Sequence, residues 1–239
     1  MPDAGAATRV LLDSAYLLHR RDYRETSLLL ELFTLQHGRI GLIAKGARRG
    51  KAGLAPILQP FRPLLASWAG RGELATLTHA EAGGADIRLR HTALFCGFYL
   101  NELLVRLLPL HDPHPELVEV YRTALAGLAA GRDLEAVLRR FELALLECLG
   151  YGLQLTADAQ TGDAIQPDRL YIYRIDTGPI IADSDDPVAL HGATLLALRD
   201  GRFDTPELRT ESKRLMRHVL AHYLEGRPLK SRELFRNST

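Results

Sequence analysis

The stretch Arg39-Ile40-Gly41-Leu42-Ile43-Ala44-Lys45-Gly46-Ala47-Arg48-Arg49-Gly50-Lys51 joins an apolar, strand-like run to a segment with four cations and two glycines. Its first half has the apolar alternation of a strand with one buried face. Its second half has the composition of a flexible loop that holds phosphate, because glycine lets backbone N–H groups come close to an anion. We therefore predict a small β-barrel that presents a basic loop.

Strand-like segments continue on both sides of this stretch. Turn signals at 21–23, 36–38 and 70–72 separate them, which is typical of an antiparallel meander. The predicted strands cover 10–12 continuing at 15–18, then 27–33, 40–44, 63–68 and 74–78. Five short strands in this length fit a partly or fully closed barrel, for which the OB-fold is the natural candidate.

The pattern changes to helix after Gly83-Gly84. Apolar residues at spacings of three and four, with Pro, Gly and Ser at the ends, predict helices at 94–108, 115–130, 134–149, 192–200 and 207–224, and a short last helix capped by Ser231. A polar insert at about 153–188 carries a predicted β-hairpin, 170–175 with 179–181. The predicted fold class is α+β, with an OB-fold domain at 1–83 and a helical domain at 84–239 that contains the insert.

Composition narrows the class of protein. The 239 residues carry a net charge of only +1, so anion binding depends on local clusters of cations. Cys96 and Cys148 lie in apolar helical patterns, which favours buried thiols and a reducing compartment over a disulfide or a metal pair. The N-terminus lacks a signal-peptide pattern, and 94–108 is too short and too polar to span a bilayer. We expect a soluble, cytoplasmic protein.

The region from residue 20 to residue 51 concentrates positive charge. It holds eight cations against three anions. Such a surplus suits binding to a phosphate backbone, although a solvated charged surface is the alternative. The candidate residues for binding a nucleic-acid backbone are Arg20, Arg21, Arg24, Arg39, Lys45, Arg48, Arg49 and Lys51.

A nucleotide-binding P-loop does not fit the same glycines. That motif needs four residues between its glycines and Ser or Thr after the lysine, whereas three residues separate Gly46 from Gly50 and Ala52 follows Lys51. Tyr23 is the candidate for base stacking, with packing on its own strand as the alternative. Alternation assigns Phe33 and Trp68 to the core.

Enzymatic chemistry finds no support in the sequence. The nine histidines are scattered, the serines lack a nucleophile elbow, and no metal-ligand spacing occurs. Asp183, Asp185 and Asp186 precede Pro187 and fit a solvated turn better than a two-metal site. A nuclease or modifying enzyme with an OB-type substrate domain stays open as an alternative, as does an adaptor that does not touch DNA. Metal-dependent cleavage of labelled DNA would favour the enzyme.

A second basic set lies in the helical half. It includes Arg139, Arg140 and Arg209, which flank apolar helical stripes. Cations beside an apolar groove suit an acidic peptide with a hydrophobic end. Ordinary helix solubilisation is the alternative for each residue.

Several blocks together resemble the RecO family of bacterial recombination mediators. They run in family order from about residue 8 to residue 236, and each is weak alone. The blocks are Arg24-Glu25-Thr26-Ser27, Gly38-Arg39, Ala44-Lys45-Gly46-Ala47-Arg48, Leu58-Gln59-Pro60-Phe61, Tyr99-Leu100-Asn101-Glu102-Leu103-Leu104, Leu138-Arg139-Arg140-Phe141-Glu142-Leu143-Ala144-Leu145-Leu146, Leu149-Gly150-Tyr151-Gly152 and Pro228-Leu229-Lys230-Ser231-Arg232-Glu233-Leu234-Phe235.

The resemblance implies a role without catalytic turnover. It implies binding of single- and double-stranded DNA, annealing of complementary strands and, with RecR, loading of RecA onto DNA coated by single-strand-binding protein. It places Arg39, Lys45 and Arg48 in the DNA-contacting loop region. Arg139, with Arg209 nearby, falls where the family receives the acidic C-terminal tail of single-strand-binding protein. The expected location is the bacterial cytoplasm, in association with the nucleoid.

The chain departs from many family members in the insert. Those members bind zinc through four cysteines, whereas the corresponding segment, 156–162, contains none. We therefore expect no metal and no cofactor, and the insert must hold itself together by its hairpin and its packing.

Overall fold

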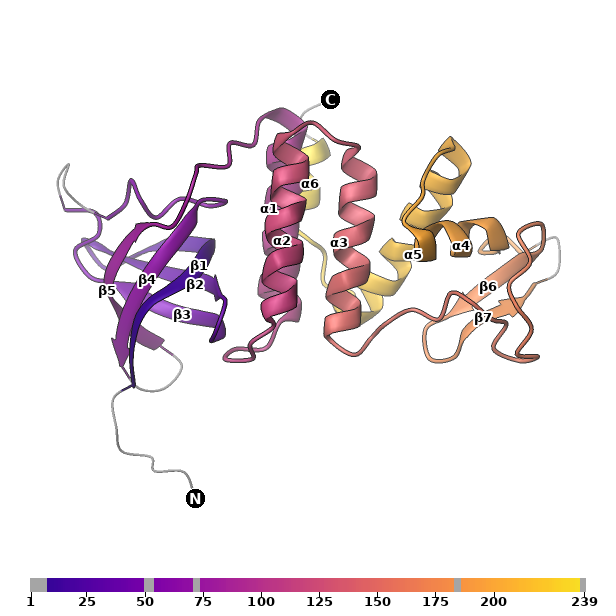
Figure 1. Cartoon of the computed structure of the whole chain (residues 1–239), viewed down its shortest axis with the longest axis horizontal. Helices are drawn as coiled ribbons and strands as arrows, with labels where there is room; N and C mark the ends of the chain where they lie inside the picture. Colours follow the sequence, from indigo (N-terminus) through magenta and orange to yellow (C-terminus); the bar gives the residue numbers. More distant parts are fainter. Residues whose placement is uncertain (1–7, 50–53, 71–73, 183–185, 237–239) are drawn as a thin grey trace, which may run out of the picture. The chain divides into compact units, whose positions relative to one another are not determined.

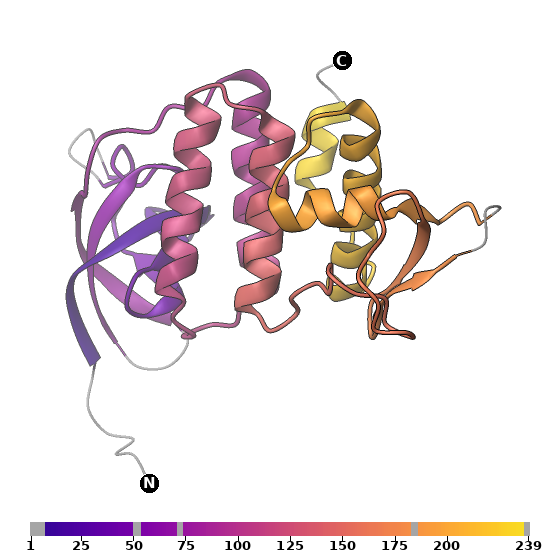
Figure 2. The ribbon, with the colours of Figure 1, turned by 45° about the vertical axis from the view of Figure 1, so that its right-hand side comes forward.

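The computed structural model describes residues 8–49, 54–70, 74–182 and 186–236. Five strands come first, then three helices, a small sheet and three more helices (Figures 1 and 2). The chain forms two compact units: Met1–Ala130 with Leu229–Thr239, and Gly131–Pro228. The first unit thus groups the barrel with the first two helices and the last one. The predicted division at residue 83 follows the change from strand to helix along the sequence and stays a prediction.

The five N-terminal strands close into a barrel in the order β1-β2-β3-β5-β4. The pairing of β3 with β5 is parallel and the other pairings are antiparallel. The strands are β1 Thr8–Tyr23, β2 Ser27–Thr34, β3 Gly38–Ala44, β4 Pro63–Gly70 and β5 Leu74–Ala82. This arrangement confirms the predicted OB-fold barrel.

Strand β1 is longer than the sequence suggested. The two apolar runs belong to one strand, whose pairing with β4 shifts at a bulge between Val10 and Asp13. The turn predicted at 21–23 is wrong: Arg21 pairs with Leu29 and Tyr23 with Ser27, and the chain turns at 24–26. Alternating polar residues on an exposed strand end look like a turn when only the sequence is read.

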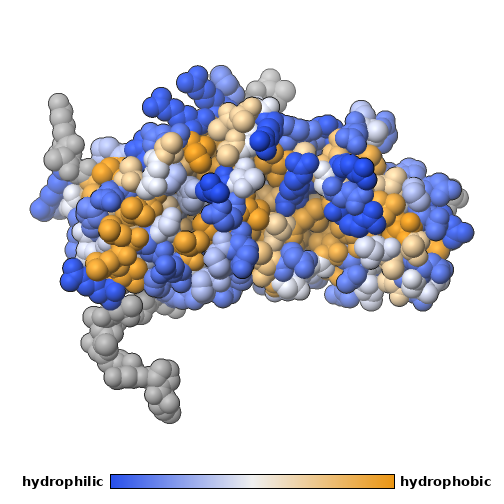
Figure 3. Space-filling model, in the orientation of Figure 1, coloured by the Kyte–Doolittle hydropathy of each residue, from blue (hydrophilic) through white to orange (hydrophobic). Residues whose placement is uncertain are grey.

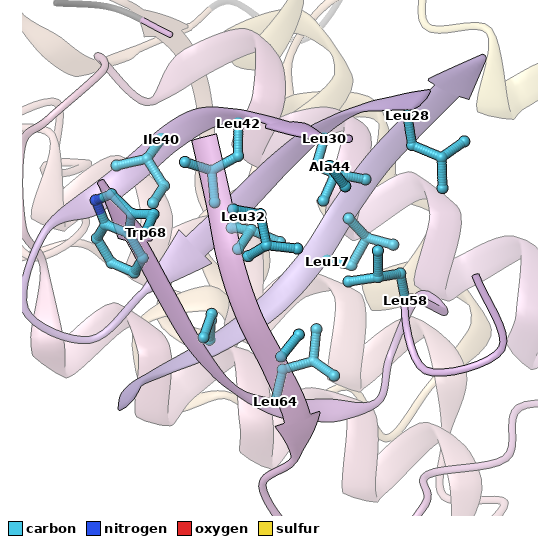
Figure 4. Packing of buried hydrophobic residues seen from close by; sticks show 14 of the residues in the cluster. Leu17, Leu28, Leu30, Leu32, Ile40, Leu42, Ala44, Leu58, Leu64 and Trp68 are labelled. Carbon is cyan, nitrogen blue, oxygen red and sulfur yellow. The ribbon is translucent and has the colours of Figure 1, made fainter. Parts of the chain in front are cut away.

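The barrel interior is filled by one face of each strand. In β2, Leu28, Leu30 and Leu32 point inward, and in β3, Ile40 and Leu42 do the same (Figure 4). Leu30, Leu32 and Leu42 have no exposed surface. Each buried leucine contributes about 2 kcal/mol through burial of apolar surface. Trp68 also belongs to this core, as predicted.

Phe33 is buried as predicted, but it contacts a helix at the outside of the barrel. Its ring meets Tyr121 of α2 (Pro115–Ala129) edge-on at 6.2 Å, and Tyr16 meets the same ring at 5.1 Å. The Tyr121 hydroxyl donates to Asn101 of α1 (His91–Leu107) at 2.5 Å, and the Asn101 amide donates to the Leu18 carbonyl at 2.8 Å. Because these buried polar groups are paired, helices and barrel form one packed unit.

Gly38, at the predicted turn before β3, permits a close approach of the chain. Its φ of +67° suits glycine, and an added Cβ would lie 2.1 Å from the Asp112 carbonyl oxygen. Next to it, the His111 N–H donates to the Arg39 carbonyl at 2.9 Å. The segment between α1 and α2 therefore packs directly on the start of β3.

The last helix, α6 (Ser231–Arg236), belongs to the first unit and packs on α1. The predicted cap at Ser231 is wrong, because Ser231 is already the first residue of the helix. Its hydroxyl donates to Glu102 of α1 instead, at 2.7 Å. A carboxylate from another helix thus takes the position of a local cap.

The described part of the second unit contains three helices, whose limits lie within one residue of the predicted ones. They are α3 Leu134–Cys148, α4 Gly192–Asp200 and α5 Pro206–Tyr223. Asp133 caps α3 by accepting from the N–H groups of Glu135 and Ala136, and Thr205 caps α5 by accepting from Leu208. Gly201 ends α4 in the left-handed conformation, with a φ of +64°.

The insert forms a small sheet with the strand order β7-β6-β8. Strands β6 (Leu170–Arg174) and β7 (Gly178–Ile181) confirm the predicted hairpin. The sequence did not reveal β8 (Leu190–His191), because a strand of two residues has no periodicity.

No described helix is both long enough and apolar enough to cross a membrane. On the face drawn in Figure 3, hydrophobic residues are interspersed among hydrophilic ones. Of the two cysteines, Cys96 is buried as predicted and Cys148 is half-buried.

Candidate nucleic-acid and peptide interfaces

Two chain segments meet at one end of the barrel. The β1–β2 turn covers residues 24–26, and the first described part of the β3–β4 loop covers residues 45–49. The register of β2 on β3 ends at the pair Leu28 and Ala44, so both segments leave the sheet together. The Arg48 N–H also donates to the Thr26 carbonyl at 3.0 Å. We call these two segments the joined loops.

Five predicted DNA-binding residues are exposed on or beside the joined loops: Arg21, Arg24, Lys45, Arg48 and Arg49. The Arg24 guanidinium lies 5.2 Å from the ring centroid of half-buried Tyr23. Exposed cations grouped in this way attract a phosphate backbone without reading bases. The stacking role of Tyr23 stays a prediction, since Arg24 occupies one face of its ring.

Arg48 makes several contacts within the joined loops. Its guanidinium pairs with Asp22 at 2.5 Å and donates to the carbonyls of Arg24 at 3.0 Å and Glu25 at 2.5 Å. A guanidinium with three protein acceptors has fewer donors left for phosphate. These contacts could not be predicted from local sequence patterns, because Asp22 and Arg48 are far apart along the chain.

Two other candidates make contacts inside the first unit. Arg20 donates to the carbonyls of Ala55 at 3.1 Å and Leu58 at 2.6 Å, which ties β1 to the segment before β4. Arg39 pairs with Glu31 at 2.5 Å, donates to the Leu108 carbonyl at 3.0 Å, and exposes 14% of its side chain. The structure does not bring these two residues into the exposed group. Lys51, the eighth candidate, lies outside the described residues.

The second unit contains a pocket of about 220 Å³ between the start of α3, the end of α4 and the start of α5. Buried Ala136, Val137 and Phe203 give it an apolar floor. Charged side chains form its rim: Arg132, Asp133, Arg140, Arg202, Asp204 and Arg209. Four cations against two anions around an apolar floor suit an acidic peptide with a hydrophobic end.

Two of the predicted tail-binding residues lie at this pocket. Arg140 is exposed and donates to the Gly201 carbonyl at 2.8 Å. Arg209 pairs with Asp133, the cap of α3, at 2.5 Å. The remaining hydrogens of both guanidinium groups are available to a carboxylate.

Arg139 lies elsewhere. It is 7% exposed and forms an ion pair with Glu142, which has no exposed surface. It does not line the pocket. The tail-binding role that the resemblance gave to Arg139 stays a prediction, and the contact that the structure shows is internal.

Most pocket residues were not singled out from the sequence, among them Arg132, Arg202 and Phe203. Each follows a helix end, with Gly131 before Arg132 and Gly201 before Arg202 and Phe203. The signal present in the sequence was a cation or an aromatic residue one or two positions after a glycine that follows a helix. It has meaning only when the fold brings the start of α3 and the end of α4 to one pocket.

One carboxylate holds the loop that begins the insert against strand β7. Asp158, 3% exposed, accepts hydrogen bonds from the N–H groups of Thr161 at 2.8 Å, Gln160 at 2.9 Å and Ile181 at 2.8 Å. The bond from Thr161 and the other two lower the pKa of Asp158 below its ordinary value, although burial opposes the shift.

The described residues contain no cluster of metal-binding side chains. None of their His, Cys, Asp and Glu side chains gather in threes or more in a way that could hold a metal ion. Of the acidic cluster before Pro187, Asp183 and Asp185 lie outside the described residues.

The fold and these two surfaces define a class: proteins with an OB-fold barrel joined to helices, with cations at one end of the barrel and around a helical pocket. Sequence comparison matches residues 9–84 to the family described as Recombination protein O N terminal, and residues 88–233 to Recombination protein O C terminal. The chain belongs to the RecO family.

Relatives with the name DNA repair protein RecO match over nearly the whole chain. The one from Methylococcus capsulatus (strain Bath) is 70% identical over 238 residues, which cover 100% of this chain and 98% of the relative. The one from Azoarcus sp. (strain BH72) is 47% identical and covers 95% of each chain. The one from Aliivibrio fischeri (strain MJ11) is 43% identical and covers 94% of each.

Proposed function

We propose that this protein is a DNA repair and recombination mediator that binds single- and double-stranded DNA and anneals complementary strands. The observation that carries the proposal is the group of exposed cations, Arg21, Arg24, Lys45 and Arg49, at the joined loops. Cations that neutralise phosphates release condensed counterions, which gives affinity with little sequence preference. Because such contacts hold the backbone, the bases of two bound strands stay free to pair.

The pocket of the second unit binds the acidic C-terminal tail of single-strand-binding protein. Its rim cations match acidic side chains and a terminal carboxylate, and its floor of Ala136, Val137 and Phe203 matches a hydrophobic end. Arg140 and Arg209 contact the tail directly. Arg139 supports the site from within α3, through its pair with Glu142.

The wider role follows from membership of the family. Relatives carry the name DNA repair protein RecO, and we extend that role to this chain. With RecR, the protein loads RecA onto DNA coated by single-strand-binding protein. It acts without catalytic turnover, in the cytoplasm and near the nucleoid. Cleavage of labelled DNA with Mg²⁺ or Mn²⁺, abolished by substitution of one acidic residue, would replace this account by an enzymatic one.

Annealing of two complementary labelled strands tests the function. The strands are used bare, coated with intact single-strand-binding protein, or coated with that protein lacking its tail. We expect annealing of bare strands and of strands coated with the intact protein, and a strong loss when the tail is missing. Equal annealing on both coated substrates would remove the tail from the account, and no annealing of bare strands would remove the function itself.

A further inference from the structure

We propose that Asp22 is a positioning residue for DNA binding: through Arg48, it fixes the two joined loops against each other so that their cations face one strand. The proposal rests on the DNA-binding function proposed above. It assigns a favourable role to an acidic side chain in a surface that binds anions, which is the opposite of what its charge alone predicts.

The contacts of Arg48 join three different parts of the barrel end. One terminal nitrogen of its guanidinium pairs with the Asp22 carboxylate at 2.5 Å. The other donates to the Arg24 carbonyl at 3.0 Å and the Glu25 carbonyl at 2.5 Å. Asp22 therefore orients the guanidinium so that it can reach the two carbonyls of the turn.

The backbone of the β3–β4 loop is fixed at the same place. Ala47 is 2% exposed and belongs to the barrel core, and its carbonyl accepts from Ala55 at 3.2 Å. Gly46, with a φ of +66°, accepts from the Arg49 N–H at 2.9 Å. Lys45 and Arg49 therefore flank an anchored residue, and Arg48 connects this anchor to the turn that carries Arg24.

The two joined loops are held together before DNA binds, and this raises their affinity for DNA. A strand that meets loops already held together does not lose affinity to their ordering. Without the Asp22–Arg48 pair, the Arg48 side chain and its contacts with the turn would have to be ordered by the DNA strand itself. Asp22 exposes 69% of its side chain, so the pair contributes little to the stability of the whole chain. The effect of removing it is expected in DNA binding and not in folding.

The direction in which one substitution changes the affinity for DNA distinguishes a positioning role from a simple charge effect. Asp22→Asn removes a negative charge from the surface, which by Coulomb attraction alone strengthens phosphate binding. If Asp22 acts by positioning, the same change weakens binding by about fivefold, the factor that corresponds to a surface ion pair. Glu25→Gln is the matched control. It removes a negative charge from the turn that follows β1 and leaves the Glu25 carbonyl, which is the group that Arg48 uses, in place.

The experiment measures binding of a fluorescent oligothymidine strand by the full chain at several salt concentrations. We expect Asp22→Asn to bind more weakly, with a shallower dependence on salt, because fewer cations reach phosphates at once. Glu25→Gln should bind as tightly as the unchanged protein or more tightly. Asp22→Asn that behaves like Glu25→Gln would overturn the positioning role and leave DNA binding intact, whereas an unchanged protein that binds no DNA would overturn both.

A double-mutant cycle with Arg48→Gln adds an independent measurement. If Asp22 acts through Arg48, the double variant Asp22→Asn/Arg48→Gln loses no more affinity than Arg48→Gln alone. Additive losses would contradict the proposal, because they would show that the two residues act separately. Equal circular dichroism and thermal midpoints among the variants confirm that the readout reports binding.

Discussion

Glu102 of α1 holds Ser231 at the start of α6 by two hydrogen bonds. Its Oε2 accepts from the Ser231 N–H at 2.8 Å and from the Ser231 hydroxyl at 2.7 Å. The other oxygen, Oε1, accepts from the Lys230 N–H at 3.0 Å. One carboxylate thus satisfies the first backbone donors of a helix that comes from the far end of the sequence, and so joins the chain's last helix to the barrel unit.

Glu102→Gln should therefore loosen α6. Burial raises the pKa of Glu102, but the hydrogen bonds from Ser231 and Lys230, together with Arg106, lower it below the ordinary value. A lowered pKa in the folded state means that the stabilisation is complete above the ordinary glutamate pKa and is lost as the pH falls through the folded value. At neutral pH we expect a loss of about 2 kcal/mol, as for hydrogen bonds to a charged group. Thermal unfolding and amide exchange in α6 measure it.

Glu119→Gln is the control for this prediction. Glu119 pairs with Arg122 on the surface of α2, with 57% of its side chain exposed. Its substitution should change the thermal midpoint little. If Glu102→Gln also left both the midpoint and α6 exchange unchanged, the carboxylate would not hold the helix.

Asp158→Ala should loosen the insert, because three backbone donors lose their acceptor. The expected loss is on the order of 3 kcal/mol, seen as faster amide exchange and easier proteolysis between residues 156 and 182. Because hydrogen bonds lower the pKa of Asp158, the unchanged insert should also loosen as the pH falls below the ordinary aspartate range. The control is Asp168→Asn, because Asp168 is exposed. Equal protection of the insert from amide exchange and proteolysis in both variants would contradict the role of Asp158.

Arg139→Ala should destabilise the second unit by about 3 kcal/mol, because it removes the guanidinium that pairs with the fully buried Glu142 carboxylate. Arg140→Ala changes the next residue, which is exposed, and should cost about 1 kcal/mol or less. Urea unfolding of the two variants makes the comparison. Weaker tail binding by Arg139→Ala with unchanged stability would instead support the direct contact implied by the family resemblance.

Arg140→Ala/Arg209→Ala should lower the affinity for an acidic peptide with a hydrophobic end. Two rim cations are removed, for which we expect a loss of about tenfold that shrinks at high salt. Annealing of bare strands should stay nearly unchanged. The double variant Arg169→Ala/Arg174→Ala removes two exposed cations from the insert of the same unit and serves as control. A similar loss in both variants would show a general charge effect and no pocket.

The barrel and most of the helices could be predicted from the sequence because their signals are local. Alternation in β2 and β3 and the helical spacing in α3 and α5 depend on neighbouring residues only. Ser231 shows where this fails. Its local position suits a cap, but the acceptor for its hydroxyl, Glu102, comes from another helix.

The candidate site was less predictable, because it depends on contacts between distant residues. Exposed Lys45 and Arg49 followed from a basic loop, whereas the pairing of Arg48 with Asp22 required the barrel to close. Charged residues are rarely buried, so nothing in the sequence separated Arg139 from exposed Arg140.

Salt-dependent binding of a single DNA strand by Lys45→Ala/Arg49→Ala tests the central claim most directly. For the unchanged protein we expect affinity to fall steeply with salt. The variant should lose affinity, and its log–log slope should be shallower by about 1.4, the value for two phosphate contacts on a single strand. The control, Arg88→Ala/Arg90→Ala, removes two exposed cations from the segment before α1 and should keep the slope. If Lys45→Ala/Arg49→Ala kept the slope of the unchanged protein while the control had a shallower slope, the claim that the joined loops bind DNA would be contradicted.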